Sequence, residues 1–203
     1  MLLGVDLGGT KIEGIVLKSR ENPEKVIRYR VDTEEEKGYS HVINNIKSLV
    51  GYIENKINYK FNRLGIGTPG TIDPDTGLLK NSNSQCLNGM PIKKDLSTIL
   101  DKTILIQNDA NCFALAETVL GSVRDQYPSA KNVFGIIIGT GVGGGVIIEG
   151  KALYGNQGIG GEWGHTIVTD SGDKCYCGKR GCVESVISGR APVSYTHLRA
   201  HET

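Results

Sequence analysis

The sequence predicts an α/β protein built from two similar halves. The chain has 203 residues, which is long enough for one large or two modest domains with a real core. An apolar strand, a glycine-rich turn and a second apolar strand occur over 2–17 and again over 133–148. Between these hairpins, apolar runs alternate with stretches of helical spacing. The recurrence predicts two domains that each offer a phosphate-holding hairpin to a shared cleft.

The first hairpin combines a carboxylate with a glycine turn. The apolar run over 2–6 ends in Asp6, and a second apolar run follows over 12–17. Backbone N–H groups, a hydroxyl and an ammonium in the turn can hold phosphate oxygens. The residues that supply them are Gly8, Gly9, Thr10 and Lys11. Asp6 lies beside them, where it can orient a metal ion and its waters. An ordinary hairpin turn explains the glycine pair equally well.

Strands and helices alternate through the rest of the first half. Apolar residues at helical spacing predict a helix over 39–57, and a shorter helix is expected over 91–100. Further strands are expected at 26–31, 64–67 and 103–107. The loop over 68–71, rich in glycine, follows the second of these strands. Ligands of α/β folds bind at such carboxyl ends of strands.

Two polar residues of the first half are candidate ligand contacts. Asn83, in a run of Asn and Ser, offers an amide to sugar hydroxyls, although turn chemistry explains it equally. Asp109 follows the strand over 103–107 and precedes a helix expected over 112–120. The dipole of that helix stabilises the carboxylate as an anion, which makes it available as a base. The alternative is a helix N-cap without chemistry.

The second hairpin repeats the design of the first. Strands are expected at 133–138 and 146–148, with a turn over 139–145 that contains five glycines. Thr140 and Gly141 correspond to the hydroxyl and the glycine of the first turn. The second hairpin is therefore also expected to hold phosphate oxygens.

A cluster of thiols and one imidazole predicts a metal-pinned loop. Three cysteines lie within eight residues, and a histidine precedes them. These residues are His165, Cys175, Cys177 and Cys182. One His and three Cys make a complete structural zinc site, and such a site contributes folding free energy. Two alternatives remain open: a reduced thiol cluster, or one disulfide with a third thiol left over.

The same loop carries two carboxylates. If His165 and Cys182 are fixed in space, their neighbours Glu162 and Glu184 are fixed too, facing one another across the loop. Two carboxylates and an imidazole suit a polyhydroxylated ligand, because each carboxylate accepts hydrogen bonds from two hydroxyl donors.

Composition excludes some classes of partner. The formal net charge is +1 with interleaved signs, which gives no electrostatic case for nucleic acid or an anionic membrane. No apolar run approaches a membrane span, and the first residues enter a strand pattern without a signal peptide. Five cysteines without an export signal favour a reducing cytosol. The expected location is therefore cytoplasmic.

Taken together, five motifs resemble the ROK family of sugar kinases and related repressors. The motifs are Asp6–Lys11, Asn108–Asn111, Gly139–Gly143, Glu162–His165 and Cys175–Cys182. The resemblance runs from Met1 to about Arg190. It implies an actin-like pair of ribonuclease-H-like domains, over 1–108 and 109–192 with the second incomplete, and ATP and sugar in the cleft between them.

The resemblance also implies a role for each motif. It makes Asp109 the catalytic base in the ATP-dependent phosphorylation of a hexose 6-hydroxyl. It assigns sugar binding to Asn108, Asp109, Glu162, His165 and Glu184. It assigns zinc binding to His165, Cys175, Cys177 and Cys182. His165 would use one ring nitrogen for zinc and the other for sugar. The two turns would hold the phosphates with Mg²⁺ between them and Asp6 in its outer shell. A homodimer is implied.

The finer resemblance is to the bacterial fructokinase branch. It depends on the segments 80–84, 87–89 and 161–165. The sequence therefore predicts a fructokinase, with glucokinase, mannokinase and N-acetylhexosamine kinase as alternatives. A sugar-sensing repressor is a rival of another class. Three observations argue against it: the first hairpin begins within ten residues of Met1, no basic patch exists, and Asp109 is present. A kinase-like sugar-binding module without catalysis is a further rival.

The end of the chain departs from the family pattern. Family members continue beyond this point. Val193–Leu198 back-translates to a sequence that resembles a transposon adapter used in making sequencing libraries. Residues 193–203 are therefore predicted to be a non-native tail, and His197 and His201 are excluded as ligand candidates.

Overall fold

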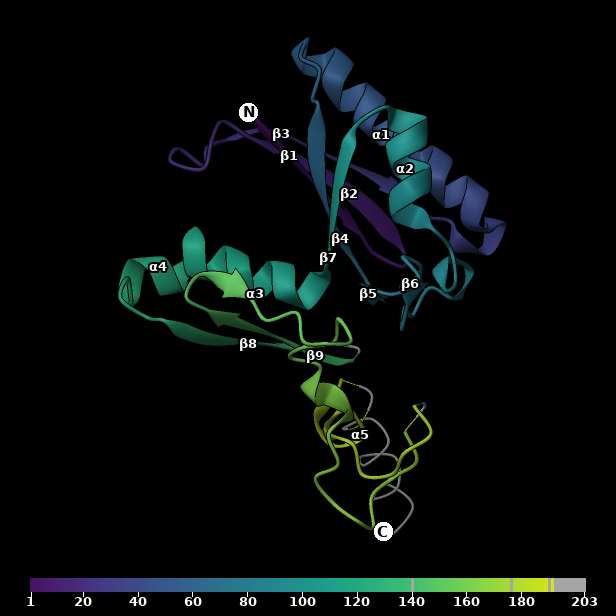
Figure 1. Ribbon diagram of the computed structural model, residues 1–203, viewed down its shortest axis with the longest axis vertical. Helices are drawn as coiled ribbons and strands as arrows, with labels where there is room; N and C mark the ends of the chain where they lie inside the picture. The colour runs from purple at the N-terminus through teal and green to yellow at the C-terminus, as the bar shows by residue number, and fades with distance from the viewer. Residues whose placement is uncertain (140, 176, 190, 192–203) are drawn as a thin grey trace, which may run out of the picture. The chain divides into compact units, whose positions relative to one another are not determined.

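The computed structural model describes residues 1–139, 141–175, 177–189 and 191, and the predicted non-native tail lies outside them. The chain divides into two compact units, Met1–Asp109 and Ala110–Thr203. Figure 1 shows the elements of both units along the chain. Each unit is a mixed α/β structure.

The first unit is built on a five-stranded sheet in the order β3-β2-β1-β4-β7. Its strands are β1 (Leu2–Leu7), β2 (Lys11–Leu17), β3 (Lys25–Asp32), β4 (Arg63–Thr68) and β7 (Thr103–Asn108). Strand β2 is antiparallel to both β1 and β3, whereas β4 runs parallel to both β1 and β7. Thr68 pairs with Asn108, so β4 and β7 end side by side at one edge. All five strands were predicted within two residues at each end.

Two helices cover one face of this sheet (Figure 1). Helix α1 (Tyr39–Ile57) confirms the predicted bounds, and α2 (Ile92–Leu100) begins one residue later than expected. The apolar stripe of α1 lies in the core with the inward residues of β1, β2 and β4. A Cβ added at Gly14 of β2 would lie 2.4 Å from Ile53 Cδ1. Glycine at this position therefore lets α1 pack closely on the sheet.

Four very short elements of the first unit were not predicted. They are η1 (Glu35–Lys37), β5 (Thr71–Ile72), β6 (Leu79–Lys80) and η2 (Gln85–Leu87). Strands β5 and β6 pair as a small antiparallel sheet. Elements of two or three residues are too short to show a periodic pattern, so no signal for them is present in the sequence.

A buried carboxylate ties the end of α1 to the segments that lead into β4 and β7. Glu54 is 4% exposed, and its Oε1 accepts a hydrogen bond of 2.9 Å from the backbone N–H of Phe61. Lys102 Nζ lies 2.9 Å from the same oxygen, and Lys60 Nζ lies 3.0 Å from Oε2. Desolvation opposes the charged form, but the Phe61 N–H and the two ammonium groups lower the pKa of Glu54.

We expect Glu54→Ala to lower the free energy of unfolding by about 3 kcal/mol at neutral pH, because it leaves the side chain of Lys102, which is only 10% exposed, without its carboxylate. The depressed pKa means that the native state holds fewer protons, so this contribution is present above the unfolded pKa of about 4.3 and is lost in stronger acid. Chemical denaturation at neutral and acidic pH measures it. Glu36→Ala, at an exposed position, is the control; equal effects of the two substitutions would contradict the expectation.

The second unit holds a three-stranded antiparallel sheet in the order β10-β9-β8. Its strands are β8 (Asn132–Ile138), β9 (Val142–Ile148) and β10 (Lys151–Ala152). Its helices are α4 (Ser122–Gln126), η3 (Trp163–His165), α5 (Val183–Ile187) and α3 (Asp109–Val119), whose first residue ends the first unit. A Cβ added at Gly135 of β8 would lie 2.7 Å from Ala114 Cβ, so α3 packs directly on this sheet.

Two expected bounds in this part of the chain are wrong. Gly143, Gly144 and Gly145 lie in β9 and not in a turn. A Cβ at Gly144 would lie 2.6 Å from Trp163 Cδ1, and one at Gly145 would lie 2.6 Å from the Ala110 carbonyl oxygen. Close packing on both faces therefore explains the glycines. Helix α3 begins at Asp109, three residues before the expected start, because acidic and amide residues favour the first helical turn.

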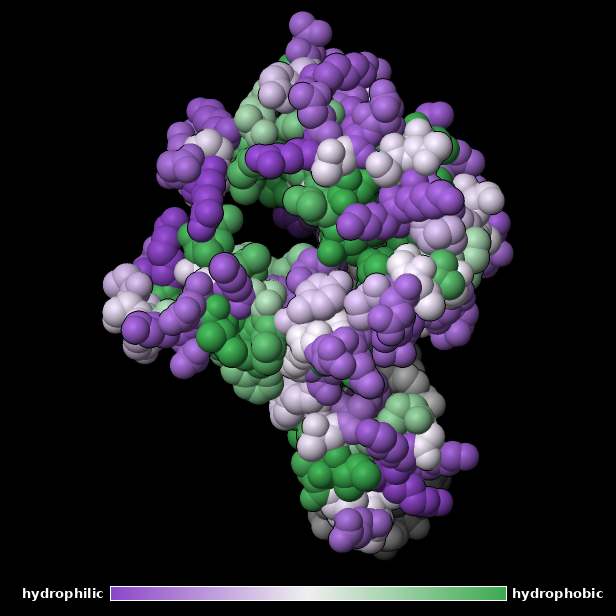
Figure 2. All heavy atoms as spheres, in the orientation of Figure 1, coloured by the Kyte–Doolittle hydropathy of each residue, from purple (hydrophilic) through white to green (hydrophobic). Residues whose placement is uncertain are grey.

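One face of β8 is open to solvent. Phe134, Ile136 and Ile138 alternate along it and are 45–58% exposed. Figure 2 shows hydrophobic residues gathered on the surface over this strand. Within the described parts of the chain, none of the helices combines the length and the apolar composition that a membrane span requires.

Candidate active site

The first glycine turn is closed by the backbone. Gly8 N–H donates to the Lys11 carbonyl over 3.0 Å, and a Cβ at Gly8 would lie 3.0 Å from the same oxygen. Gly9, Thr10 and Lys11 are exposed. The turn therefore presents the residue types predicted to hold phosphate at the surface of the first unit.

Asp6 lies at the end of β1, beside this turn. It pairs across the sheet with Glu13. Desolvation raises the pKa of Asp6, the nearby Glu13 raises it further, and Arg30 acts in the opposite direction. A divalent cation would relieve this repulsion, and carboxylate oxygens are ligands that Mg²⁺ accepts. The residues present at the turn thus fit a magnesium-bound phosphate.

The adjacent ends of β4 and β7 place two predicted residues. Asn108 is 5% exposed, and its Nδ2 donates to the Gly70 carbonyl over 3.2 Å. Gly70 has a φ of 80°, and a Cβ there would lie 2.3 Å from the Lys80 carbonyl oxygen. Only glycine fits this loop. Asp109 is exposed and is the first residue of α3, where the helix dipole stabilises a carboxylate.

Two threonines that flank the loop between β4 and β5 were missed by the sequence reasoning. Thr68 is 0% exposed and Thr71 is 2% exposed. Among the described residues, neither Oγ1 atom has a hydrogen-bond partner. A buried hydroxyl without a partner costs about 1–3 kcal/mol, which marks a place where a ligand or water supplies the bond. The loop over 68–71 was expected to bind ligand, but these hydroxyls carried no separate signal.

The loop that contains Asn83 is held by a different amide. Asn83 itself is exposed. Asn88 Oδ1 accepts from Ser82 N–H over 2.9 Å, and Asn88 Nδ2 donates to the Ser82 carbonyl over 2.9 Å. Ser82 Oγ accepts from Ser84 N–H over 3.1 Å. Asn88 and the buried serines therefore shape the loop, and a sugar contact by Asn83 stays a prediction.

The second glycine turn contacts Glu184, one of the residues predicted to bind sugar. Gly139 N–H donates to the Gly141 carbonyl over 2.9 Å. Glu184 Oε2 accepts from Val142 N–H over 3.1 Å, and a Cβ at Gly141 would lie 3.0 Å from that oxygen. The carboxylate of Glu184, in the first turn of α5, therefore caps the turn. Thr140, the other predicted phosphate contact here, lies outside the described residues.

Trp163 fixes the segment that carries Glu162 and His165. Its Nε1 donates to the Gly143 carbonyl over 2.9 Å, and its ring packs edge-on against Phe134 at 5.7 Å between centroids. A Cβ at Gly164 would lie 2.2 Å from the Val142 carbonyl oxygen. The 3-10 turn η3 is thus pinned to β9. Glu162 is exposed and His165 is half-buried.

The predicted metal ligands converge. The donor atoms of His165, Cys175, Cys177 and Cys182 all lie within 4.8 Å of one another. His165 Nδ1 lies 3.6 Å from Cys175 Sγ, and the sulfurs of Cys177 and Cys182 lie 3.6 Å apart, too far for a disulfide. The three cysteines are reduced thiols.

This geometry fits zinc. A tetrahedral ion about 2.3 Å from each sulfur separates two sulfurs by about 3.8 Å, close to the spacing found here. Burial raises the pKa of Cys182 to about 12, with the neighbouring thiols adding to the effect. The thiol must lose its proton to bind a metal, so binding would release that proton. His165 would use Nδ1 for the metal.

The backbone of the thiol loop requires glycines at two positions. Gly178 and Gly181 have φ values of 91° and 67°. A Cβ at Gly181 would lie 1.7 Å from the Thr169 carbonyl oxygen. Cys175 N–H donates to the Lys179 carbonyl over 2.8 Å and closes the knuckle. The backbone therefore folds back on itself between the cysteines, and the binding of a metal there stays a prediction.

Comparisons with known proteins give the family. The sequence model of the ROK family matches residues 2–202. An N-acetyl-D-glucosamine kinase from Aliivibrio salmonicida is 36% identical over 213 residues, covering 100% of this chain and 68% of the relative. Another N-acetyl-D-glucosamine kinase, from Vibrio atlanticus, is 38% identical over 200 residues and is covered to 64%. These names do not support the predicted preference for fructose.

The fold is also that of a solved relative. The ROK hexokinase from Thermus thermophilus has a TM-score of 0.82 and 31% identity, over 97% of this chain and 64% of that one. The chain thus spans about two thirds of the length of its relatives. The fold is the α/β, actin-like ATPase fold that the resemblance implied. With its motifs, its fold and its match over nearly the whole length, the chain belongs to the ROK family, whose relatives here are sugar kinases.

Proposed function

We propose that this protein transfers the γ-phosphoryl group of ATP to the 6-hydroxyl of an N-acetylated hexosamine, with N-acetyl-D-glucosamine as the preferred sugar. The main support for this reaction is the position of Asp109, which is exposed as the first residue of α3 directly after β7. The relatives named N-acetyl-D-glucosamine kinase support the choice of sugar. This choice replaces fructose.

In the proposed mechanism, Asp109 takes the proton of the sugar hydroxyl as that oxygen attacks the phosphorus. Phosphoryl transfer needs little covalent chemistry from protein, so positioning and charge neutralisation supply most of the rate. Asn108, Glu162, His165 and Glu184 would bind sugar hydroxyls, and the buried hydroxyls of Thr68 and Thr71 are further candidates for that role. The contacts of Asn83 and Thr140 stay predictions.

The chain would hold the phosphates with its two glycine turns. The first turn supplies Gly8, Gly9, Thr10 and Lys11, and the second supplies Gly141 with Thr140. Asp6 would hold Mg²⁺ through its waters, and the bound ion neutralises phosphate charge. Zinc would contribute folding free energy to the loop that carries His165 and Glu184. The homodimer and the cytoplasmic location stay predictions. A glucokinase from Streptomyces griseus that is 30% identical was crystallised with glucose and AMPPNP, which supports ATP as the donor.

We expect a sugar panel with ATP to rank N-acetyl-D-glucosamine first. Its kcat/KM should exceed those of glucose, mannose and fructose by about tenfold or more, because a site that hydrogen-bonds an acetamido group leaves polar groups unpaired when a sugar lacks it. A coupled assay of ADP release gives the ranking. The highest kcat/KM for fructose would restore the original prediction and contradict the proposal. The Asp109→Asn protein, purified identically, measures contaminating kinases.

A further inference from the structure

Thr33, a buried residue directly after β3, donates two hydrogen bonds to the first glycine turn. Thr33 is 0% exposed. Its Oγ1 donates to the Gly8 carbonyl over 2.7 Å, and its backbone N–H donates to the Thr10 carbonyl over 2.9 Å. The backbone bond to Thr10 continues the hydrogen bonding of β2 and β3 past their last pair, Lys11 with Asp32, and the hydroxyl adds a second bond to the turn. Thr33 therefore contacts the backbone on either side of Gly9.

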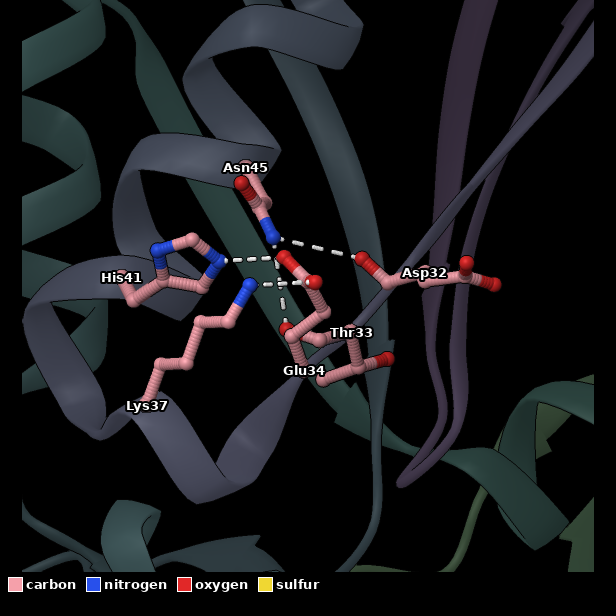
Figure 3. Close-up of polar contacts among 6 residues, drawn as sticks. All are labelled: Asp32, Thr33, Glu34, Lys37, His41 and Asn45. Carbon is pink, nitrogen blue, oxygen red and sulfur yellow. Dashed lines mark hydrogen bonds and ion pairs between the residues drawn. The ribbon is translucent and has the colours of Figure 1, made fainter.

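The other side of Thr33 is fastened to α1 (Figure 3). Asn45 Nδ2 donates to the carbonyl oxygens of Asp32 and Thr33 over 3.2 and 3.3 Å. Asn45 lies inside α1, which packs on the core of the first unit. The hydrogen bonds thus run from a rigid helix through Thr33 to the turn.

The next residue, Glu34, turns the chain from β3 toward α1. Glu34 adopts the left-handed conformation with φ 52°, which is rare for a residue other than glycine. Its carboxylate accepts from His41 Nε2 over 2.7 Å and from Lys37 Nζ over 2.5 Å (Figure 3). Lys37 lies in η1, directly before α1, and His41 lies in α1 itself. The side chain of the strained Glu34 is therefore held by two neighbouring side chains.

We propose that Thr33 is a positioning residue that holds the first glycine turn in the shape required for the phosphates of ATP, with Asn45 anchoring it to α1. The part of this inference that concerns ATP rests on the proposed function. The hold of Thr33 on the turn does not.

The physical reason lies in the glycine pair. Glycine loses more conformational freedom on ordering than other residues, so a turn with Gly8 and Gly9 is costly to keep in one shape. The two hydrogen bonds from the buried Thr33 offset this loss of entropy, so the turn is ordered before a ligand binds. The Thr33 hydroxyl also satisfies the Gly8 carbonyl, which would otherwise lack this donor.

The test compares Thr33→Val with Thr33→Ser. Valine keeps the shape and the backbone N–H but removes the hydroxyl, whereas serine retains it. Thr98→Val is the matched control, because it also removes a hydroxyl bond to a backbone carbonyl, that of Lys94, in the same unit. Hydrogen exchange of the amides of residues 8–11 and the Kd values of Mg-ATP and N-acetyl-D-glucosamine are measured for each protein.

We expect Thr33→Val to speed amide exchange at the turn and to raise the Kd of Mg-ATP about 3- to 10-fold, as loss of one hydrogen bond implies. The Kd of the sugar should not change, and Thr33→Ser should restore both readouts. Thr98→Val should leave the turn unaffected. If Thr33 only stabilised the fold, Thr33→Val would weaken the binding of Mg-ATP and of the sugar together.

The outcomes separate the two proposals. Unchanged exchange at the turn in Thr33→Val overturns the inference whether or not the chain is a kinase. Faster exchange with an unchanged Kd of Mg-ATP overturns the role in nucleotide binding. A wild-type chain that binds no ATP, with faster exchange in Thr33→Val, contradicts the proposed function and supports the hold of Thr33 on the turn.

Discussion

Replacing Asp109 by Asn is expected to lower kcat for phosphoryl transfer by about 10²–10⁴-fold, the usual contribution of a general base. The amide has nearly the same size and can still contact a sugar hydroxyl, but it cannot accept the proton that leaves. The Kd of N-acetyl-D-glucosamine should therefore stay within about twofold of the wild-type value. Steady-state kinetics and isothermal titration measure the two quantities on the same preparations.

Asp101→Asn is the control for this substitution. Asp101 is an exposed acid that follows α2 in the left-handed conformation, which Asn also adopts readily. Its kcat should equal that of the wild type. Undiminished turnover in Asp109→Asn would remove Asp109 from the role of base. Equal losses of kcat in both variants would point to a general effect of lost negative charge.

Replacing Cys175 by Ser is expected to abolish zinc binding and with it the binding of sugar. Cys175 is 5% exposed and its sulfur lies 3.6 Å from His165 Nδ1, so it is one of four donor atoms that all lie within 4.8 Å of one another. The apparent free energy of binding of a structural zinc ion is about 10–16 kcal/mol in small zinc peptides, and most of it is folding free energy. Without it, the segment that holds His165 and Glu184 should lose its fixed shape.

Elemental analysis gives the zinc content of Cys175→Ser, and hydrogen exchange over 163–189 reports the order of the loop. Cys86→Ser is the control, because Cys86 lies in η2 of the first unit, far along the chain from the cluster. It should retain zinc and sugar binding. A wild-type protein that holds no zinc, and that binds sugar equally well before and after chelation, would show that the loop needs no metal.

The elements that the sequence predicted best are those with a sustained period. Helix α1 shows seven buried positions at helical spacing, and its bounds were predicted to the residue. The four candidate metal ligands were predicted as a set because thiols and imidazole at short spacing have few other uses, and their donor atoms converge. Local chemistry was sufficient in both cases.

What the sequence could not predict depends on contacts between distant residues. Gly144 and Gly145 read as a turn, yet they are strand residues because Trp163 and Ala110 occupy the space of their side chains. The bond from Val142 N–H to Glu184 spans 42 positions, and that from Thr33 to Gly8 spans 25. No local pattern indicates such pairs. The unpartnered hydroxyls of Thr68 and Thr71 became visible only once their burial was known.

The preference for fructose was inferred from three short segments, and the comparison over the whole chain favours a different sugar. The segment over 80–84 illustrates the difficulty. Its shape depends on Asn88 and on the buried Ser82, which are held together by two hydrogen bonds of 2.9 Å. Its polar residues therefore serve the loop first, and they carry little information about which sugar binds.

Phosphorus NMR of the chain with ATP, Mg²⁺ and N-acetyl-D-glucosamine tests the proposed reaction most directly. We expect ADP and, in equal amount, a phosphomonoester whose signal couples to the methylene protons at C6, with neither product formed by Asp109→Asn. ADP with inorganic phosphate and unmodified sugar, or a phosphate on another hydroxyl, would contradict it.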